Sequence, residues 1–238
     1  MKRLSTAAAL IVTLVTAPAF AQDPKFRVYA GGAYFPSSAT FDQTVTYAEF
    51  QEQTTVNAAY SRKKGAGFDG SLEYDFTPTV GVAVGFHTAS RENEVTLDAS
   101  VPHPFFFNRP RTASGAADLG FSEKGIHLDL VYNAPTSGFL GFSIFGGPSF
   151  FTVDADVVER VTYTSAFPFD EITVTGADPL AVSKSAVGFN VGAGMDFRFN
   201  PNFGIGVRAR FSQATISEGG VDLKAGGVSV GGGLSLRF

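Results

Sequence analysis

The sequence predicts an all-β protein: an eight-stranded antiparallel up-and-down transmembrane β-barrel with long extracellular loops and short periplasmic turns. Three observations predict it. Apolar and polar residues alternate with period two through eight segments, as they do in strands with two unlike faces. The connections between these segments are alternately short and long. The chain also begins like an exported protein, yet it has no run of 18 apolar residues that could form a membrane-spanning helix.

Composition narrows the class of protein further. The 238 residues include no cysteine, so disulfide scaffolds and thiolate zinc sites are excluded. The net charge of −4 disfavours nucleic acid as a partner. Charged residues make up only 17% of the chain, while 27 residues are glycine and 25 are phenylalanine. Because soluble domains carry about 25% charged residues, this chain is predicted to have a surface that does not face water.

The first 21 residues are predicted to be a cleaved signal peptide. A basic start at Lys2 and Arg3 precedes an apolar run over Ala7–Val15, and Ala19 and Ala21 form an A-x-A cleavage site. Residues 22–238 would then form one barrel domain. The whole chain has a net charge of −4, and removal of Lys2 and Arg3 with the signal peptide leaves −6.

The first four predicted strands include the clearest case of alternation. In Phe68–Phe76, the residues Asp69, Glu73 and Asp75 share one face, and aromatic and aliphatic residues share the other. The same pattern occurs in the other three, which are Phe26–Tyr34, Val80–His87 and Ile126–Tyr132.

The last four predicted strands repeat the pattern, with many glycines on the polar face. They are Leu140–Phe145, Val187–Phe199, Phe203–Phe211 and Val228–Phe238. Most of the eight strands approach the 9–11 residues that a tilted strand needs to cross a membrane.

The lengths of the connections indicate which end of the barrel faces the periplasm and which faces the outside of the cell. Short turns follow the second, fourth and sixth strands, and they contain the Pro and Asn residues that suit turns. Long polar loops follow the first, third, fifth and seventh strands, at Pro36–Gly65, Thr88–Gly125, Pro148–Lys184 and Ala214–Leu223. The third loop alternates again and is expected to extend the barrel hairpins, which leaves ten strands as an alternative.

The polar face is predicted to line a narrow lumen, because the apolar face carries no charge within any strand. Eight strands enclose a space that side chains can fill. Five acids and five arginines are expected to form ion pairs there: Arg27, Asp69, Glu73, Asp75, Asp129, Asp196, Arg198, Arg208, Arg210 and Arg237. The alternative is a secreted β-sandwich with the apolar face as its core, but its outward face would be rich in Lys and Thr rather than in glycine.

Certain motifs resemble a known family. Glu73-Tyr74-Asp75-Phe76-Thr77-Pro78, the similar turn around Pro201 and the terminal Leu234-Ser235-Leu236-Arg237-Phe238 are similar to those of small Gram-negative outer-membrane barrels of the opacity-protein and OmpA-type porin-like kind. The resemblance implies an outer-membrane location among lipid and lipopolysaccharide. It also implies that Leu234, Leu236 and Phe238 form the signal that the barrel-assembly machinery recognises.

Three functions remain open from the sequence. The first is a structural or surface-interaction role, in envelope integrity or adhesion, with no catalysis, cofactor or metal and with an unknown extracellular partner for the loops. Phe105–Phe107 could dock that partner or lie in the lipopolysaccharide layer, with Arg109 and Arg111 near phosphates. The alternative is that the loops pack on one another and cap the barrel. The second is a narrow or gated porin-like channel with charges at its periplasmic end.

The third function is a barrel enzyme that modifies lipid A. Ser143, His127 and Asp129 could supply a nucleophile, a base and an acid, as acyl transfer requires. However, all three are predicted to face the lumen rather than the lipid.

Overall fold

The computed structural model describes residues 25–36, 39–136, 138–218 and 221–238. It contains ten strands: β1 Phe26–Phe35, β2 Thr40–Glu49, β3 Glu52–Arg62, β4 Gly65–Asp75, β5 Val80–Val101, β6 Arg111–Asn133, β7 Leu140–Thr164, β8 Thr173–Arg198, β9 Phe203–Glu218 and β10 Val221–Arg237. Within the described residues no helix has the length and apolar content needed to cross a membrane.

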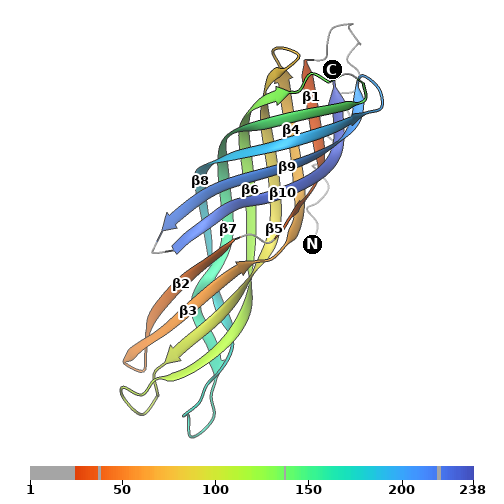
Figure 1. Cartoon of the computed structure of the whole chain (residues 1–238). Helices are drawn as coiled ribbons and strands as arrows, with labels where there is room; N and C mark the ends of the chain where they lie inside the picture. Colours follow the sequence, from red (N-terminus) through yellow and green to blue (C-terminus); the bar gives the residue numbers. More distant parts are fainter. Residues whose placement is uncertain (1–24, 37–38, 137, 219–220) are drawn as a thin grey trace, which may run out of the picture.

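Eight of the ten strands form a closed antiparallel ring (Figure 1). Their order around the ring is β1, β4, β5, β6, β7, β8, β9 and β10, and β10 pairs again with β1. The closing pair runs in register from Arg27 opposite Arg237 to Tyr34 opposite Val230. The eight strands are those that the alternation predicts, so the predicted barrel is confirmed.

The remaining two strands correct the expectation that Pro36–Gly65 is a loop. β2 and β3 form a hairpin whose turn residues Phe50 and Gln51 have positive φ, as a tight hairpin turn requires. β3 then pairs with the part of β5 nearer the long-loop end, where Arg62 lies opposite Asn93. We call the long-loop end of the barrel its upper end and the short-turn end its lower end, although Figure 1 draws the upper end at the bottom. Because both strands are rich in Thr, Val and Tyr, their composition favours the pleated conformation.

This hairpin contacts the far wall of the barrel as well as β5. The hydroxyl of Tyr60 accepts a hydrogen bond from the Val158 amide of β7 at 2.8 Å, and the hydroxyl of Tyr47 accepts one from Val161 at 3.3 Å. Arg62 donates to the carbonyl of Lys224 on β10 at 2.7 Å. The hairpin therefore crosses the upper barrel from β5 to β7.

The other long connections are shorter than expected because strand structure continues far into them. β5 and β6 leave only residues 102–110 between them, and β7 and β8 leave residues 165–172. Most of the predicted loops Thr88–Gly125 and Pro148–Lys184 is therefore ladder-paired strand. The third connection lengthens β7 and β8 and adds no strand to the ring.

The polarity of the two faces reverses along the strands. On the lower part of β5, outward residues such as Val84 are apolar and exposed, and we call the belt of such residues the apolar band. Higher on the same strand, the outward residue Thr96 is polar, whereas its inward neighbours Val95 and Leu97 are fully buried. The lower barrel thus has a polar interior, and the upper barrel has an apolar one.

The apolar interior of the upper barrel, which we call the upper core, is built by seven strands. It joins β2 and β3 to the upper parts of β5, β6, β7, β9 and β10. Its largest members include Phe41, Tyr60, Leu97, Leu119, Phe121, Phe151, Ile172, Ile216 and Leu223.

Gly147 of β7 allows β7 to lie close to β6, and replacing it with alanine is expected to be destabilising. A Cβ at this position would lie 1.9 Å from the backbone carbonyl oxygen of Leu128, so one of the strands must move. We expect Gly147→Ala to lower the free energy of unfolding by about 1–3 kcal/mol. Urea titration followed by far-UV circular dichroism measures this change.

Gly32→Ala is the matched control, because a Cβ on Gly32 meets no atom within 4 Å. We expect this variant to unfold at the same urea concentration as the original protein. Equal midpoints for the two variants would show that the close approach at Gly147 does not limit stability.

Candidate functional site

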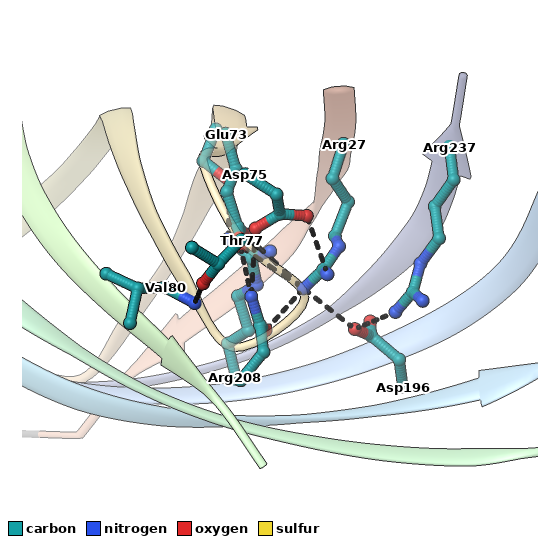
Figure 2. Close-up of polar contacts among 10 residues, drawn as sticks. Arg27, Glu73, Asp75, Thr77, Val80, Asp196, Arg208 and Arg237 are labelled. Carbon is teal, nitrogen blue, oxygen red and sulfur yellow. Dashed lines mark hydrogen bonds and ion pairs between the residues drawn. The ribbon is translucent and has the colours of Figure 1, made fainter. Parts of the chain in front are cut away.

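Arg27 organises the charged residues at the short-turn end of the lumen (Figure 2). Its guanidinium lies 3.3 Å from a carboxylate oxygen of Glu73 and 3.3 Å from one of Asp75. It also donates to Asn133 at 2.8 Å, and the amide of Asn133 donates in turn to both Glu73 and Asp75. Two acids of β4 are therefore held by one arginine of β1 and one asparagine of β6.

A second set of charges completes this lower cluster. Arg237 donates to Asp196 at 3.3 Å, and Asp196 also lies 3.9 Å from Arg27. Arg198 donates to the backbone carbonyl of Leu140 at 3.1 Å. The lower cluster thus consists of Arg27, Glu73, Asp75, Asn133, Asp196, Arg198 and Arg237.

A middle cluster lies further along the lumen. Arg210 of β9 contacts Asp69 of β4 at 3.0 Å and Asp129 of β6 at 3.5 Å, so it crosses the barrel interior. Arg208 donates to the hydroxyl of Ser71 and stacks over the ring of Tyr29, 4.0 Å from its centroid. The space among these arginines is too small to hold a water molecule. All ten lumen residues singled out from the sequence therefore lie in the lower and middle clusters.

Two histidines extend the polar contacts of the lumen from the middle cluster toward the long-loop end. His87 and His127 are joined at 2.8 Å, and the other ring nitrogen of His127 contacts the hydroxyl of Ser149 at 2.7 Å. Asp129 is engaged by Asn190 and Arg210. Among the hydrogen bonds of the described residues, none links Ser143 to His127, so the three residues considered for acyl transfer do not form a hydrogen-bonded set.

Sequence reasoning missed a third cluster, where the polar lumen meets the upper core. Glu123 is fully buried and accepts a hydrogen bond from Arg91 at 2.6 Å and another from the Gly226 amide at 3.1 Å. Arg62 of β3 also reaches this region, where its guanidinium lies 3.6 Å from the ring centroid of Phe121. Burial lowers the pKa of Arg62 to about 10, which leaves it charged at neutral pH.

This upper cluster holds more positive than negative charge. Arg62 and Arg91 are both buried, and Glu123 is the acid that lies with them. Two nitrogens of each arginine are buried without a hydrogen-bond partner. Alternation does not reveal this cluster, because Arg91 and Asn93 and their outward neighbours are all polar, as in a solvated loop.

The long-loop end carries a group of aromatic residues that we call the aromatic tip. Four of its members are exposed, Phe105, Phe106, Phe107 and Phe167, and the fifth, Phe169, is half-buried. Phe167 is 86% exposed and Phe107 is 69% exposed. Phe105 and Phe169 lie 5.7 Å apart, so the two hairpin loops meet through their rings.

Arg111 ties these loops together, which corrects the expectation that it faces phosphates. Its buried guanidinium donates to the carbonyl of Pro102 at 2.7 Å and to that of Phe169 at 3.3 Å. Arg109 instead remains exposed, with its guanidinium 5.5 Å from the ring of Phe106. Arg111 therefore stabilises the aromatic tip, and Arg109 lies exposed beside it.

The remaining predicted site residues lie at the chain ends. Ala19 and Ala21 fall outside the described residues. Leu234 and Phe238 are exposed on the outer face, and the backbone of Phe238 exchanges hydrogen bonds with Phe26. Within the described ranges, no group of three or more His, Asp or Glu residues could hold a metal ion.

Comparisons with known proteins give a family and a fold. The family model of the outer membrane protein β-barrel domain matches residues 7–238. No curated protein sequence matches the chain. The solved structure of the outer membrane protein OprG from Pseudomonas aeruginosa has a TM-score of 0.50 and 13% identity, covering 90% of this chain and 96% of OprG. At this identity, the likeness shows a shared barrel fold.

Two further solved structures are more distant. Neisserial surface protein A has a TM-score of 0.49 and 13% identity, covering 90% of this chain and 97% of its own. Ail, the attachment invasion locus protein of Yersinia pestis, has a TM-score of 0.43 and 14% identity, covering 91% of this chain and 100% of its own.

Proposed function

The chain belongs to the outer membrane protein β-barrel domain family, and from this premise we propose that it is a surface-interaction protein without catalytic activity. The apolar band lies in the outer membrane, the short turns face the periplasm and the aromatic tip points outward. We further propose that residues 1–21 are a cleaved signal peptide, and that Leu234, Leu236 and Phe238 serve as the assembly signal.

The exposed aromatic tip is the observation that carries this proposal. Contiguous apolar surface far from any core is uncommon in proteins and marks sites of contact with other molecules. Phe107 and Phe167 are mostly exposed, although Arg111 holds their loops through two backbone carbonyls. A preorganised apolar surface loses little conformational entropy when it binds a partner.

The height of the tip favours a partner outside the cell's own membrane. β5 continues from Thr88 to Val101 above the apolar band. With a rise of about 3.3 Å per residue and a strand tilt near 40°, this places the tip roughly 35 Å above the band. The outward polar faces of β5 and β6 lie between the band and the tip, among the lipopolysaccharide.

The filled interior supports this function over that of a channel. The cavity among Asp69, Arg208 and Arg210 is too small for a water molecule, and the upper core fully buries Val95 and Leu97. We therefore expect no discrete openings when the protein is inserted into planar lipid bilayers. Stepwise conductance would favour the channel instead, and a lipid A mass shift on expression would favour an enzyme.

Replacing Phe105, Phe106 and Phe107 with serine tests the proposed role of the tip. We expect cells that express this variant to adhere several-fold less to hydrocarbon droplets and to cultured cell monolayers, because three exposed rings are lost. The matched control replaces three outward polar residues of the same hairpin, Thr96, Thr112 and Ser114, with alanine. Both variants should keep the heat-dependent gel migration of a folded barrel. A folded tip variant with unchanged adhesion would rule out the aromatic tip as the contact surface.

A further inference from the structure

A cavity of about 500 Å³ opens at the periplasmic end of the barrel, and we call it the vestibule. Its walls come from the ends of β1, β6, β7, β8 and β10 and from residues 78–79 and 134–136 of the turns after β4 and β6. Arg27, Arg198 and Arg237 line it, together with the acid Asp196. Figure 2 shows Arg27 and Arg237 on either side of Asp196.

The acids near the vestibule are not shared evenly among its three arginines. Asp196 lines the vestibule and pairs with Arg237, and Glu73 and Asp75 pair with Arg27 from outside the lining. Arg198 has no carboxylate within ion-pair distance among the described residues, and its Nε is buried without a partner. The Nε of Arg27, which is itself buried, also lacks a partner. Arg27 and Arg237 thus have acidic partners, and Arg198 is the guanidinium of the lining without one among the described residues.

Two of the guanidinium groups converge on a single point. A Cβ built on Gly141 would lie 3.7 Å from Nη2 of Arg237, 3.9 Å from Nη2 of Arg198 and 3.8 Å from the Cβ of Asp196. Because residue 141 is a glycine, this point is not filled by a side chain. A small oxyanion there could accept hydrogen bonds from both arginines, and such charge-assisted bonds are among the strongest in proteins.

The inner end of the vestibule is closed, which favours binding over passage. Arg208, Ser71 and Tyr29 fill the next layer of the lumen. A molecule that enters from the periplasm would therefore stop against the lower cluster.

We propose that the vestibule binds a phosphate group presented from the periplasm, either as inorganic phosphate or as a phosphate monoester. A phosphate monoester carries between about −1.5 and −2 charges at pH 7 and offers three acceptor oxygens, so it could accept hydrogen bonds from Arg198 and Arg237 together. Arginine is suited to phosphate because its planar fork donates two parallel hydrogen bonds. This site lies at the opposite end of the barrel from the aromatic tip and does not depend on the proposed surface role.

Isothermal titration calorimetry tests the proposal on the full protein folded in micelles of a non-ionic sugar detergent, which carries no phosphate. The titrants are inorganic phosphate, glycerol 3-phosphate and succinate. Binding of both phosphates would identify the phosphate group as the ligand, and binding of glycerol 3-phosphate alone would assign the site to monoesters. Absence of phosphate binding, or equally tight binding of succinate, would overturn the proposal.

Two variants locate the binding to the vestibule. Arg198→Met removes the guanidinium that lacks an acidic partner. We expect this variant to bind phosphate at least about tenfold more weakly, because a hydrogen bond to a charged group is lost. Gly141→Asp places a carboxylate beside Arg198 and Arg237, and we expect it to abolish binding by occupying the site. Arg160→Met removes the same charge at the extracellular end and should leave binding unchanged. Unchanged binding in folded Arg198→Met and Gly141→Asp proteins would contradict the vestibule as the site.

Discussion

Replacing Glu123 with leucine is expected to lower the free energy of unfolding by about 3–5 kcal/mol, the usual cost of removing one member of a buried ion pair. Glu123 is fully buried, and its carboxylate accepts hydrogen bonds from Arg91 and from the Gly226 amide. Without it, Arg91 and Arg62 would keep two buried positive charges with no acid beside them. Urea titration in detergent micelles, followed by circular dichroism because the chain has no tryptophan, measures the change.

Two further variants separate charge from packing at this position. Glu123→Gln keeps the shape and a hydrogen-bond acceptor but removes the charge, so its loss of stability should be smaller than that of Glu123→Leu. Adding Arg91→Met to Glu123→Leu removes one of the uncompensated charges, and we expect part of the lost stability to return. If Glu123→Leu unfolds at the same urea concentration as the original protein, the upper cluster does not depend on its acid.

The eight barrel strands could be predicted because the lower barrel meets two very different environments. Outward residues such as Leu72 and Leu130 face lipid, and inward residues such as Asp69 and Asp129 line a polar interior. This contrast gives a strong period of two in the sequence. The ring closure also follows, because an unpaired strand edge is not tolerated within a membrane.

The upper barrel was harder to predict because its polarity pattern is inverted and weaker. Val95 and Leu97 are one residue out of phase with Val82 and Val84, so the segment does not continue the lipid-facing pattern. Polar outward residues such as Glu94 then made it resemble a solvated loop. The β2–β3 hairpin was missed for the same reason, although its Thr, Val and Tyr content favours strands.

The partners of the lumen charges could not be derived from alternation alone. The pattern predicts that Arg210 and Asp69 face inward, but they are 141 positions apart and lie on β9 and β4, which are not neighbours. Their contact depends on strand register and on which side chains cross the lumen. The charge balance of the vestibule likewise depends on which acid pairs with which arginine.

Arginine substitutions along the outward face of β5 should be costly below the polarity reversal and nearly neutral above it. Val84 is 51% exposed and lies within the apolar band, so Val84→Arg should lower the free energy of unfolding by about 2–4 kcal/mol, as arginine does when it faces lipid. Thr96 points outward on the same strand above the band, and Thr96→Arg should change stability by less than about 0.5 kcal/mol.

The inward neighbour of Thr96 completes the argument about where the membrane ends. Leu97 is fully buried in the upper core, so Leu97→Ala should cost about 2–5 kcal/mol through lost packing, although Thr96→Arg costs almost nothing. Urea unfolding of the three variants in lipid vesicles gives these differences directly. If lipid extended to the height of Thr96, Thr96→Arg would be as costly as Val84→Arg. If the upper barrel were instead a set of solvated loops, Leu97→Ala would have little effect. Only a barrel that leaves the lipid between Val84 and Thr96 and continues above it as a water-facing domain with an apolar core gives all three results.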